Sequence, residues 1–567
     1  MFGMGRIVWG SAMAASDTAR TATSGHSKAL RRDVGLIGLT FFSLGSIIGS
    51  GWLLGALDAA EVAGPASLIS WILAAFMLAA LALVTAELGS AYPVAGGMAR
   101  FPYFAFGPVA GFTAGWAAYL QAVTIAPIEV EAALTYLQST DWAQRNLVML
   151  NANGTLTGVG FLIATAAMLL FTLINLWGVK LLADSNNVVV IWKIAVPILT
   201  IIVLMTLTFH SSNFTAGGGF VPFGAHGIFA ALPVGVVFAL QGFEQAVQMG
   251  GEARDPRRHL SRAIISAMFI GAAIYILLEI TFVTSLHPSH LANGWSKPLG
   301  AGADKFGAYY ILALGAGAGW LATILLIDAV ISPAGTGLIY LGTSARLSYA
   351  LGEEPAMPDK LTDTSKRGIP VWSVLLALVL GLLTFLPFPS WASLVGLVTE
   401  ATAVMYAFAP VSLAALHRRD PHKTKGYRAP MPAVLCPAAF CFANLIIYWS
   451  TFDANWKIFV AIGIGVAIFG GALLARGTRA GARGQVDWRS TMWIWPWFGG
   501  MTLIGYLGRY GGNNTLPDWW DLAVVIGFSL VIFYWAVSLA MDTDRVRAAV
   551  ETERQQLEAQ EDLNLPG

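Results

Sequence analysis

The sequence predicts an all-α polytopic membrane protein with 12–14 transmembrane helices. Only 11% of its 567 residues are charged and 56% are hydrophobic, whereas soluble proteins carry about 25% charged residues. The apolar residues also gather in runs of about 20, the length at which a helix crosses the hydrocarbon core. A soluble body of this size would lack the polar side chains needed to cover its surface.

Twelve apolar runs are followed by two weaker ones. The last two form either two spans or one span and an interfacial helix, because Trp493, Trp495 and Trp497 suit the headgroup belt. The expected spans are 34–60, 65–92, 107–138, 158–181, 185–210, 226–250, 263–286, 308–342, 371–387, 390–416, 431–451, 455–475, 491–508 and 518–541.

These spans divide the chain into five parts. We expect an N-terminal tail (1–33), a ten-helix transport core (34–416), two further helices (417–476), two extra C-terminal segments (477–541) and a charged tail (542–567).

Basic residues predict the orientation of these spans, because cytoplasmic loops carry an excess of Lys and Arg. With the N-terminus inside, most of the 33 basic residues fall in inner segments. We therefore expect a multi-pass protein of the cell membrane with both termini cytoplasmic. The outer loops then hold only Arg145, Lys297, Lys305, Lys457 and Arg509.

Several function classes are excluded by composition. A net charge of +1 gives no basic surface for nucleic acid. Cys436 and Cys441 lie five residues apart in an apolar run and predict buried thiols. No metal-ligand spacing or Ser/His/Asp arrangement is legible, so we expect no enzyme, no cofactor and no metal. No repeat resembles the selectivity filter of a channel.

Two spans carry glycine at their centres. The first contains Gly45, Gly49 and Gly51, and the sixth contains Gly235 and Gly242. Glycine weakens a helix, and irregular backbone at membrane depth is tolerated only in protein or beside a cavity. Interruptions at spans one and six predict a five-plus-five inverted repeat, the architecture of many secondary transporters. The alternative is that these glycines allow close helix packing.

The same residues resemble the amino acid–polyamine–organocation (APC) superfamily. The run GSIIGSGW (45–52) is similar to its glycine-rich substrate loop, and FALQGFE (238–244) to its aromatic–Gly–aromatic–acid segment. Further similarity lies at 87–97, 251–258, 344–346 and 366–370. A narrower resemblance, at 51–55, 99–102 and 209–214, is to the bacterial aspartate–proton symporter-like branch. The resemblance implies a LeuT-like fold with broken helices one and six and alternating access.

Half-helix ends in such a fold bind the main-chain groups of an amino acid. We expect the first segment to hold the α-carboxylate, carbonyls near Ile47 and in the second segment to take the α-ammonium, and Trp52 and Phe243 to act as lids. The expected substrate-binding residues are Ile47, Ile48, Gly49, Ser50, Gly51, Phe238, Ala239, Leu240, Gln241 and Gly242.

Lys193 and Glu244 are the expected proton-coupling residues. Lys193 falls about eight residues, or ~12 Å, into span five, too deep to reach the inner surface easily. In proton-dependent relatives, the resemblance implies, a lysine in this helix takes the place of sodium; the alternative is structural pairing. Glu244 adjoins the second broken segment and either acts in function or braces the loop. For Glu129 and Glu131, packing or solvent exposure is favoured over a role at an outer gate.

The sequence thus predicts a proton-coupled amino-acid symporter. An amino-acid or polyamine exchanger on the same fold is the alternative. The branch resemblance implies aspartate, yet no arginine lies near the broken helices, so neutral and cationic amino acids stay open as substrates.

Overall fold

The computed structural model describes residues 34–94, 96–177, 179–300, 307–352, 359–365, 369–386, 390–420, 426–480, 487–517 and 519–562. The predicted N-terminal tail and residues 366–368 of the last family-like stretch lie outside this part of the chain.

Within the described residues, ten helical segments are long and apolar enough to cross a membrane. This confirms the predicted all-α polytopic fold. The helices of these segments are α4 (Ser67–Ala91, continuous with α3), α6 (Pro108–Gln138), α8 (Gly158–Trp177), α9 (Val179–Leu207), α13 (Pro256–Ser285), α15 (Gly319–Gly352), α17 (Trp391–Arg419), α18 (Pro432–Trp449), α19 (Phe452–Ala480) and α22 (Trp520–Ser538).

Shorter helices complete the bundle and its two ends. The shorter apolar ones are α2 (Leu36–Ile47), α16 (Val371–Thr384) and α21 (Ile494–Leu507). The other short ones are α5 (Gly97–Phe106), α7 (Asp141–Asn146), α14 (Ala308–Gly315) and α20 (Trp488–Thr491), and the chain continues into the polar helix α23 (Thr543–Asp562).

The two predicted interruptions are present. The first span consists of α2, which ends at Ile47, and α3 (Gly51–Ala63). The sixth consists of α10 (Gly224–Ala230), the π-helical turn η3 (Leu232–Val236), α11 (Val237–Leu240) and α12 (Gln245–Gln248). Residues 241–244 between α11 and α12 are not helical.

Glycine serves both predicted purposes here. A Cβ on Gly51 would lie 2.8 Å from the Cα of Ala239, so the two broken segments touch through backbone. Gly242 has φ +117°, a conformation that favours glycine, and its Cβ would lie 2.9 Å from the carbonyl carbon of Ser46. The same glycines therefore break the helices and let them approach closely.

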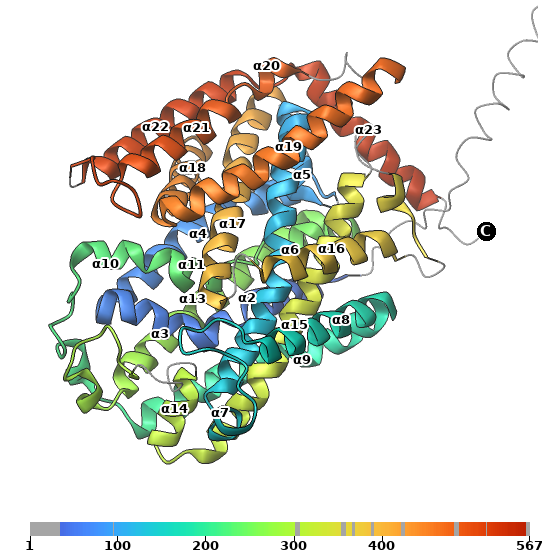
Figure 1. Cartoon of the computed structure of the whole chain (residues 1–567). Helices are drawn as coiled ribbons and strands as arrows, with labels where there is room; N and C mark the ends of the chain where they lie inside the picture. Colours follow the sequence, from blue (N-terminus) through green and yellow to red (C-terminus); the bar gives the residue numbers. More distant parts are fainter. Residues whose placement is uncertain are drawn as a thin grey trace, which may run out of the picture.

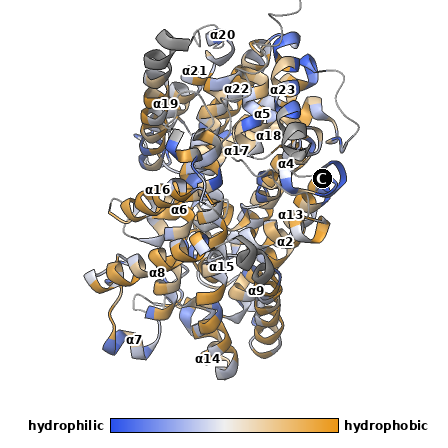
Figure 2. Ribbon diagram, turned by 90° about the vertical axis from the view of Figure 1, so that its right-hand side faces the viewer, coloured by the Kyte–Doolittle hydropathy of each residue, from blue (hydrophilic) through white to orange (hydrophobic). Residues whose placement is uncertain are grey.

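The long helices form two groups around these segments. α4 packs against α13, α13 also packs along α2, and α6 packs against α15, α16 and α17. In Figure 1, α7 and α14 lie at one end of the molecule, and α5 and α23 lie towards the other. Figure 2 shows hydrophobic residues along the long helices and hydrophilic ones at α7 and around α5 and α23.

Span eight differs from its predicted bounds. The structure divides 308–342 into the short helix α14 and the separate helix α15, which begins only at Gly319. The turn between them contains Gly317 with φ +73°, a conformation that ends a helix and that apolarity alone does not reveal.

The tryptophans of the C-terminal region also lie elsewhere than expected. The rings of Trp493 and Trp497 are fully buried, and Trp497 Nε1 donates to Asn444 Oδ1 of α18 over 2.7 Å. Trp495 is exposed. The rings of Trp493 and Trp497 therefore hold α21 against the bundle and do not face a headgroup belt.

Candidate functional site

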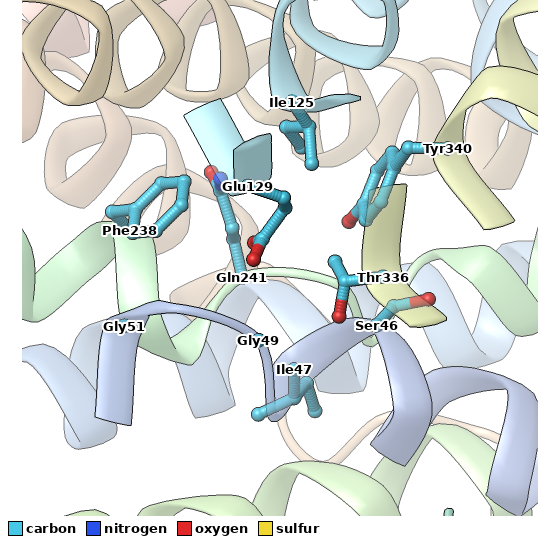
Figure 3. Close-up of a pocket in the computed structure, with 10 residues that line it drawn as sticks. All are labelled: Ser46, Ile47, Gly49, Gly51, Ile125, Glu129, Phe238, Gln241, Thr336 and Tyr340. Carbon is cyan, nitrogen blue, oxygen red and sulfur yellow. The ribbon is translucent and has the colours of Figure 1, made fainter. Parts of the chain in front are cut away.

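A small cavity lies between the two broken segments. Its volume is about 10 Å³, which is room for a single water molecule. An amino acid does not fit there unless the lining residues move. The residues that line it, drawn in Figure 3, are Ser46, Ile47, Gly49, Gly51, Ile125, Glu129, Phe238, Gln241, Thr336 and Tyr340.

The beginning of α3 holds a carboxylate. The backbone N–H of Ser50 donates to Oε2 of Glu129 over 2.8 Å, and Glu129 is only 1% exposed. The first N–H groups of a helix lack intrahelical partners and carry the positive end of its dipole. A Cβ on Gly49 would lie 2.5 Å from Oε1 of Glu129, so a larger residue would require the carboxylate to shift from this position.

Glu129 is buried, which excludes the solvent exposure considered from sequence and is compatible with packing, and the hydrogen bond to Ser50 places it at the first broken segment. The signal that identifies it is helical spacing. Gln121, Ile125 and Glu129 follow one another at intervals of four, so they share one face of α6. Ile125 and Glu129 line the cavity, and Gln121 donates to Glu244 over 3.3 Å.

The end of α2 holds an ammonium group. Lys193 Nζ donates to the carbonyl of Gly45 and to Oγ1 of Thr336, each over 2.6 Å. Tyr275 Oη donates to the carbonyl of Ile47 over 2.8 Å. These carbonyls belong to the last turn of α2, the negative end of its dipole, where a cation is stabilised.

Lys193 lies buried in the middle of α9, whose part long and apolar enough to cross a membrane begins at Asn187. The helix begins at Val179, so Lys193 is about 21 Å along it, and the side chain is 1% exposed. The charges of Glu129 and Asp328 both act on its ammonium. The broken first span thus has the buried amine of Lys193 at the end of α2 and the buried carboxyl group of Glu129 at the beginning of α3.

Half of the ten predicted binding residues line the cavity: Ile47, Gly49, Gly51, Phe238 and Gln241. Ser50 reaches the site through its N–H, and its Oγ accepts from Trp391 Nε1 over 3.2 Å. Besides Ser50, the predicted residues that do not line the cavity are Ile48, Ala239, Leu240 and Gly242.

The two predicted lids lie outside the cavity lining. Trp52 Nε1 donates to Oδ2 of Asp328 over 3.1 Å, and Trp52 stacks on Tyr309 of α14. Phe243 stacks on Tyr406 of α17, with ring centroids 4.9 Å apart. Both rings are buried, and their role as gates stays a prediction.

Glu244 is surrounded by hydrogen-bond donors. Tyr406 Oη and the N–H of Gly242 donate to Oε2 over 2.5 and 3.0 Å. The amides of Gln121 and Gln245 donate to Oε1 over 3.3 and 3.2 Å. Two of these four donors, Gln121 of α6 and Tyr406 of α17, tie the unwound segment to neighbouring helices, an arrangement that fits the bracing alternative for Glu244.

Comparison with known proteins adds an independent line of evidence. A family model described as amino acid permease matches residues 34–472. The chain is 32% identical to the glutamate/serine transporter AimA of Bacillus subtilis, over 94% of this chain and 98% of that protein. It is 31% identical to the aspartate-proton symporter of the same organism, over 89% and 96%. Identity to the branched-chain amino acid permease BcaP of Lactococcus lactis is 28%, over 72% and 88%.

Proposed function

Since the chain belongs to the amino acid permease family, we propose that it is a proton-coupled symporter for acidic amino acids. Membership also confirms the LeuT-like fold class, with its five-plus-five inverted repeat and broken helices one and six. The chain is a multi-pass membrane transporter and not an enzyme.

The hydrogen bond from Ser50 N–H to Glu129 carries the proposal of proton coupling. The N-terminus of α3 is the place where a substrate α-carboxylate binds in this proposal, and the side chain of Glu129 occupies it in the structure without substrate. Two carboxylates cannot share one small buried site unless one of them takes up a proton. Protonation of Glu129 therefore frees the N–H of Ser50 for the substrate.

Lys193 carries or relays the proton on the other side of the broken segment. Its ammonium and the Glu129 carboxylate are both buried, and an unpaired buried charge is costly. A change of protonation at one group therefore shifts the protonation equilibrium of the other. The ammonium of Lys193 already binds the Gly45 carbonyl, which supports transport that needs no sodium.

The proposed roles of the remaining predicted residues follow from the cavity. The main chain of residues 47–51 binds the α-carboxylate, and carbonyls of residues 238–242 take the α-ammonium. The carbonyl of Ile47 already accepts from Tyr275, and those of Phe238 and Gly242 accept from the N–H groups of Gln241 and Gln245, so the carbonyls between them are the ones proposed for the ammonium. Trp52 and Phe243 gate the site from its two sides.

Acidic substrates are supported by the names of two relatives, a glutamate/serine transporter and an aspartate-proton symporter. The test is uptake of labelled aspartate, glutamate and serine into proteoliposomes without sodium. We expect saturable uptake that an inward proton gradient stimulates. Uptake that does not depend on the proton gradient but requires an amino acid inside the vesicle would instead establish an exchanger.

We also propose that both termini are cytoplasmic and that residues 34–416 form the transport core. Only five basic residues fall in the expected outer loops, and the others, apart from Lys193 within a span, fall in inner segments, which supports this orientation. Reporter domains fused after residue 567 test it, because a reporter active only in the cytoplasm should be active there. An active periplasmic reporter would reverse the orientation.

A further inference from the structure

The side chain of Gln241 lacks one hydrogen-bond partner inside the cavity. The residue is 2% exposed and lines the cavity beside Phe238. Its Oε1 accepts from Oγ1 of Thr402 over 2.6 Å. Within the described part of the chain, nothing accepts a hydrogen bond from its Nε2. Buried polar groups are nearly always paired, so this amide marks the place of a missing partner.

The chemistry of the amide defines that partner. Thr402 donates to the oxygen of Gln241 and so turns the NH₂ group away from α17. Figure 3 shows the end of this side chain on the cavity side, between Phe238 and Glu129. An NH₂ group only donates, so its partner must be an acceptor. A substrate brings such a group as a side-chain carboxylate or hydroxyl.

The surroundings strengthen this contact. Phe238 packs edge-on against Trp391, and Ile125 lines the same cavity, so apolar as well as polar groups surround this buried amide. A hydrogen bond from an amide to a carboxylate is stronger in such surroundings than in water. The amine of Lys193 already donates to Gly45 and Thr336, so Gln241 is the donor in this cavity that is considered for the substrate side chain.

We propose that Gln241 determines substrate selectivity, because its unpaired Nε2 donates to the side-chain carboxylate of an acidic amino acid. This inference rests on the proposed function, in which the α-carboxylate binds at Ser50. The amide of Gln241 then donates a hydrogen bond to a second acceptor on the same substrate molecule. Alanine has no such acceptor and lysine presents a donor, so both leave the amide unpaired.

The test compares competition by aspartate, glutamate, serine, alanine and lysine against a labelled substrate in proteoliposomes. Gln241→Leu should lower the apparent affinity for aspartate relative to alanine by roughly tenfold to a hundredfold, the loss expected for a hydrogen bond to a charged group. Gln241→Glu should favour lysine over aspartate. Gln248→Leu is the matched control, because Gln248 lies outside the cavity lining, and its selectivity should equal that of the wild type.

Each outcome decides a different point. Unchanged selectivity in Gln241→Leu, or an equal loss for every amino acid, overturns the inference and leaves the proposed transport intact. If this variant does not fold, Thr402→Val provides the same readout, since the amide loses its anchor and selectivity for aspartate should weaken. A wild-type protein that transports none of the five amino acids contradicts the proposed function itself.

Discussion

Replacing Glu129 by glutamine is the sharpest perturbation of the proposed coupling. The variant keeps the size of the side chain and an oxygen that accepts from Ser50, but it removes the charge. A hydrogen bond to a charged group contributes about 1.5–3 kcal/mol, and a neutral one about 0.5–1.5 kcal/mol. The side chain at position 129 competes with the substrate carboxylate for the N–H of Ser50. The substitution weakens its hydrogen bond by about 1–1.5 kcal/mol, which corresponds to about tenfold in the affinity for the substrate.

Two results are expected for Glu129→Gln in a binding assay on purified protein. Aspartate should bind roughly tenfold more tightly than to the wild type at alkaline pH, where Glu129 is ionised. In the wild type, affinity should rise as the pH falls and Glu129 takes up a proton, whereas affinity in the variant should not depend on this group. Glu131→Gln is the control, because Glu131 is buried in the same helix outside the cavity lining. Weaker binding by Glu129→Gln, or an unchanged pH dependence, would refute the reasoning.

Three further predictions concern coupling and stability. Lys193→Ala should abolish uptake driven by a proton gradient and retain exchange between labelled and unlabelled substrate; gradient-driven uptake at the wild-type rate would contradict its role. Gly51→Ala places a Cβ 2.8 Å from backbone and should destabilise the protein by about 1–3 kcal/mol in thermal unfolding. Gly55→Ala, with its nearest atom at 3.6 Å, should change little. Trp497→Ala should cost about 3–5 kcal/mol, because the ring is fully buried; a similar loss for exposed Trp495→Ala would argue against this packing.

Much of the fold follows from local properties of the sequence. The scarcity of charge and the length of the apolar runs predict the spans because every membrane helix must satisfy the same two conditions. The interruptions follow from Gly49, Gly51 and Gly242, since glycine at the centre of a span needs a structural reason. Neither inference requires knowledge of which helices are neighbours.

The partners in the site could not be predicted in this way. Glu129 and Ser50 are 79 residues apart, and Asp328 receives the indole N–H groups of Trp52 and Trp192 from two other helices. Such contacts depend on how the helices pack, which composition and periodicity do not determine. The same reason explains Trp497, whose partner Asn444 lies on another helix.

The most direct test of proton coupling measures whether adding substrate causes protons to move across the membrane. Proteoliposomes containing a trapped pH-sensitive dye start at equal pH on both sides, without sodium, and receive aspartate outside. If uptake is coupled to protons, we expect aspartate to acidify the lumen in vesicles with the wild-type protein but not in vesicles with Lys193→Ala. Uptake of labelled aspartate without acidification would contradict the account.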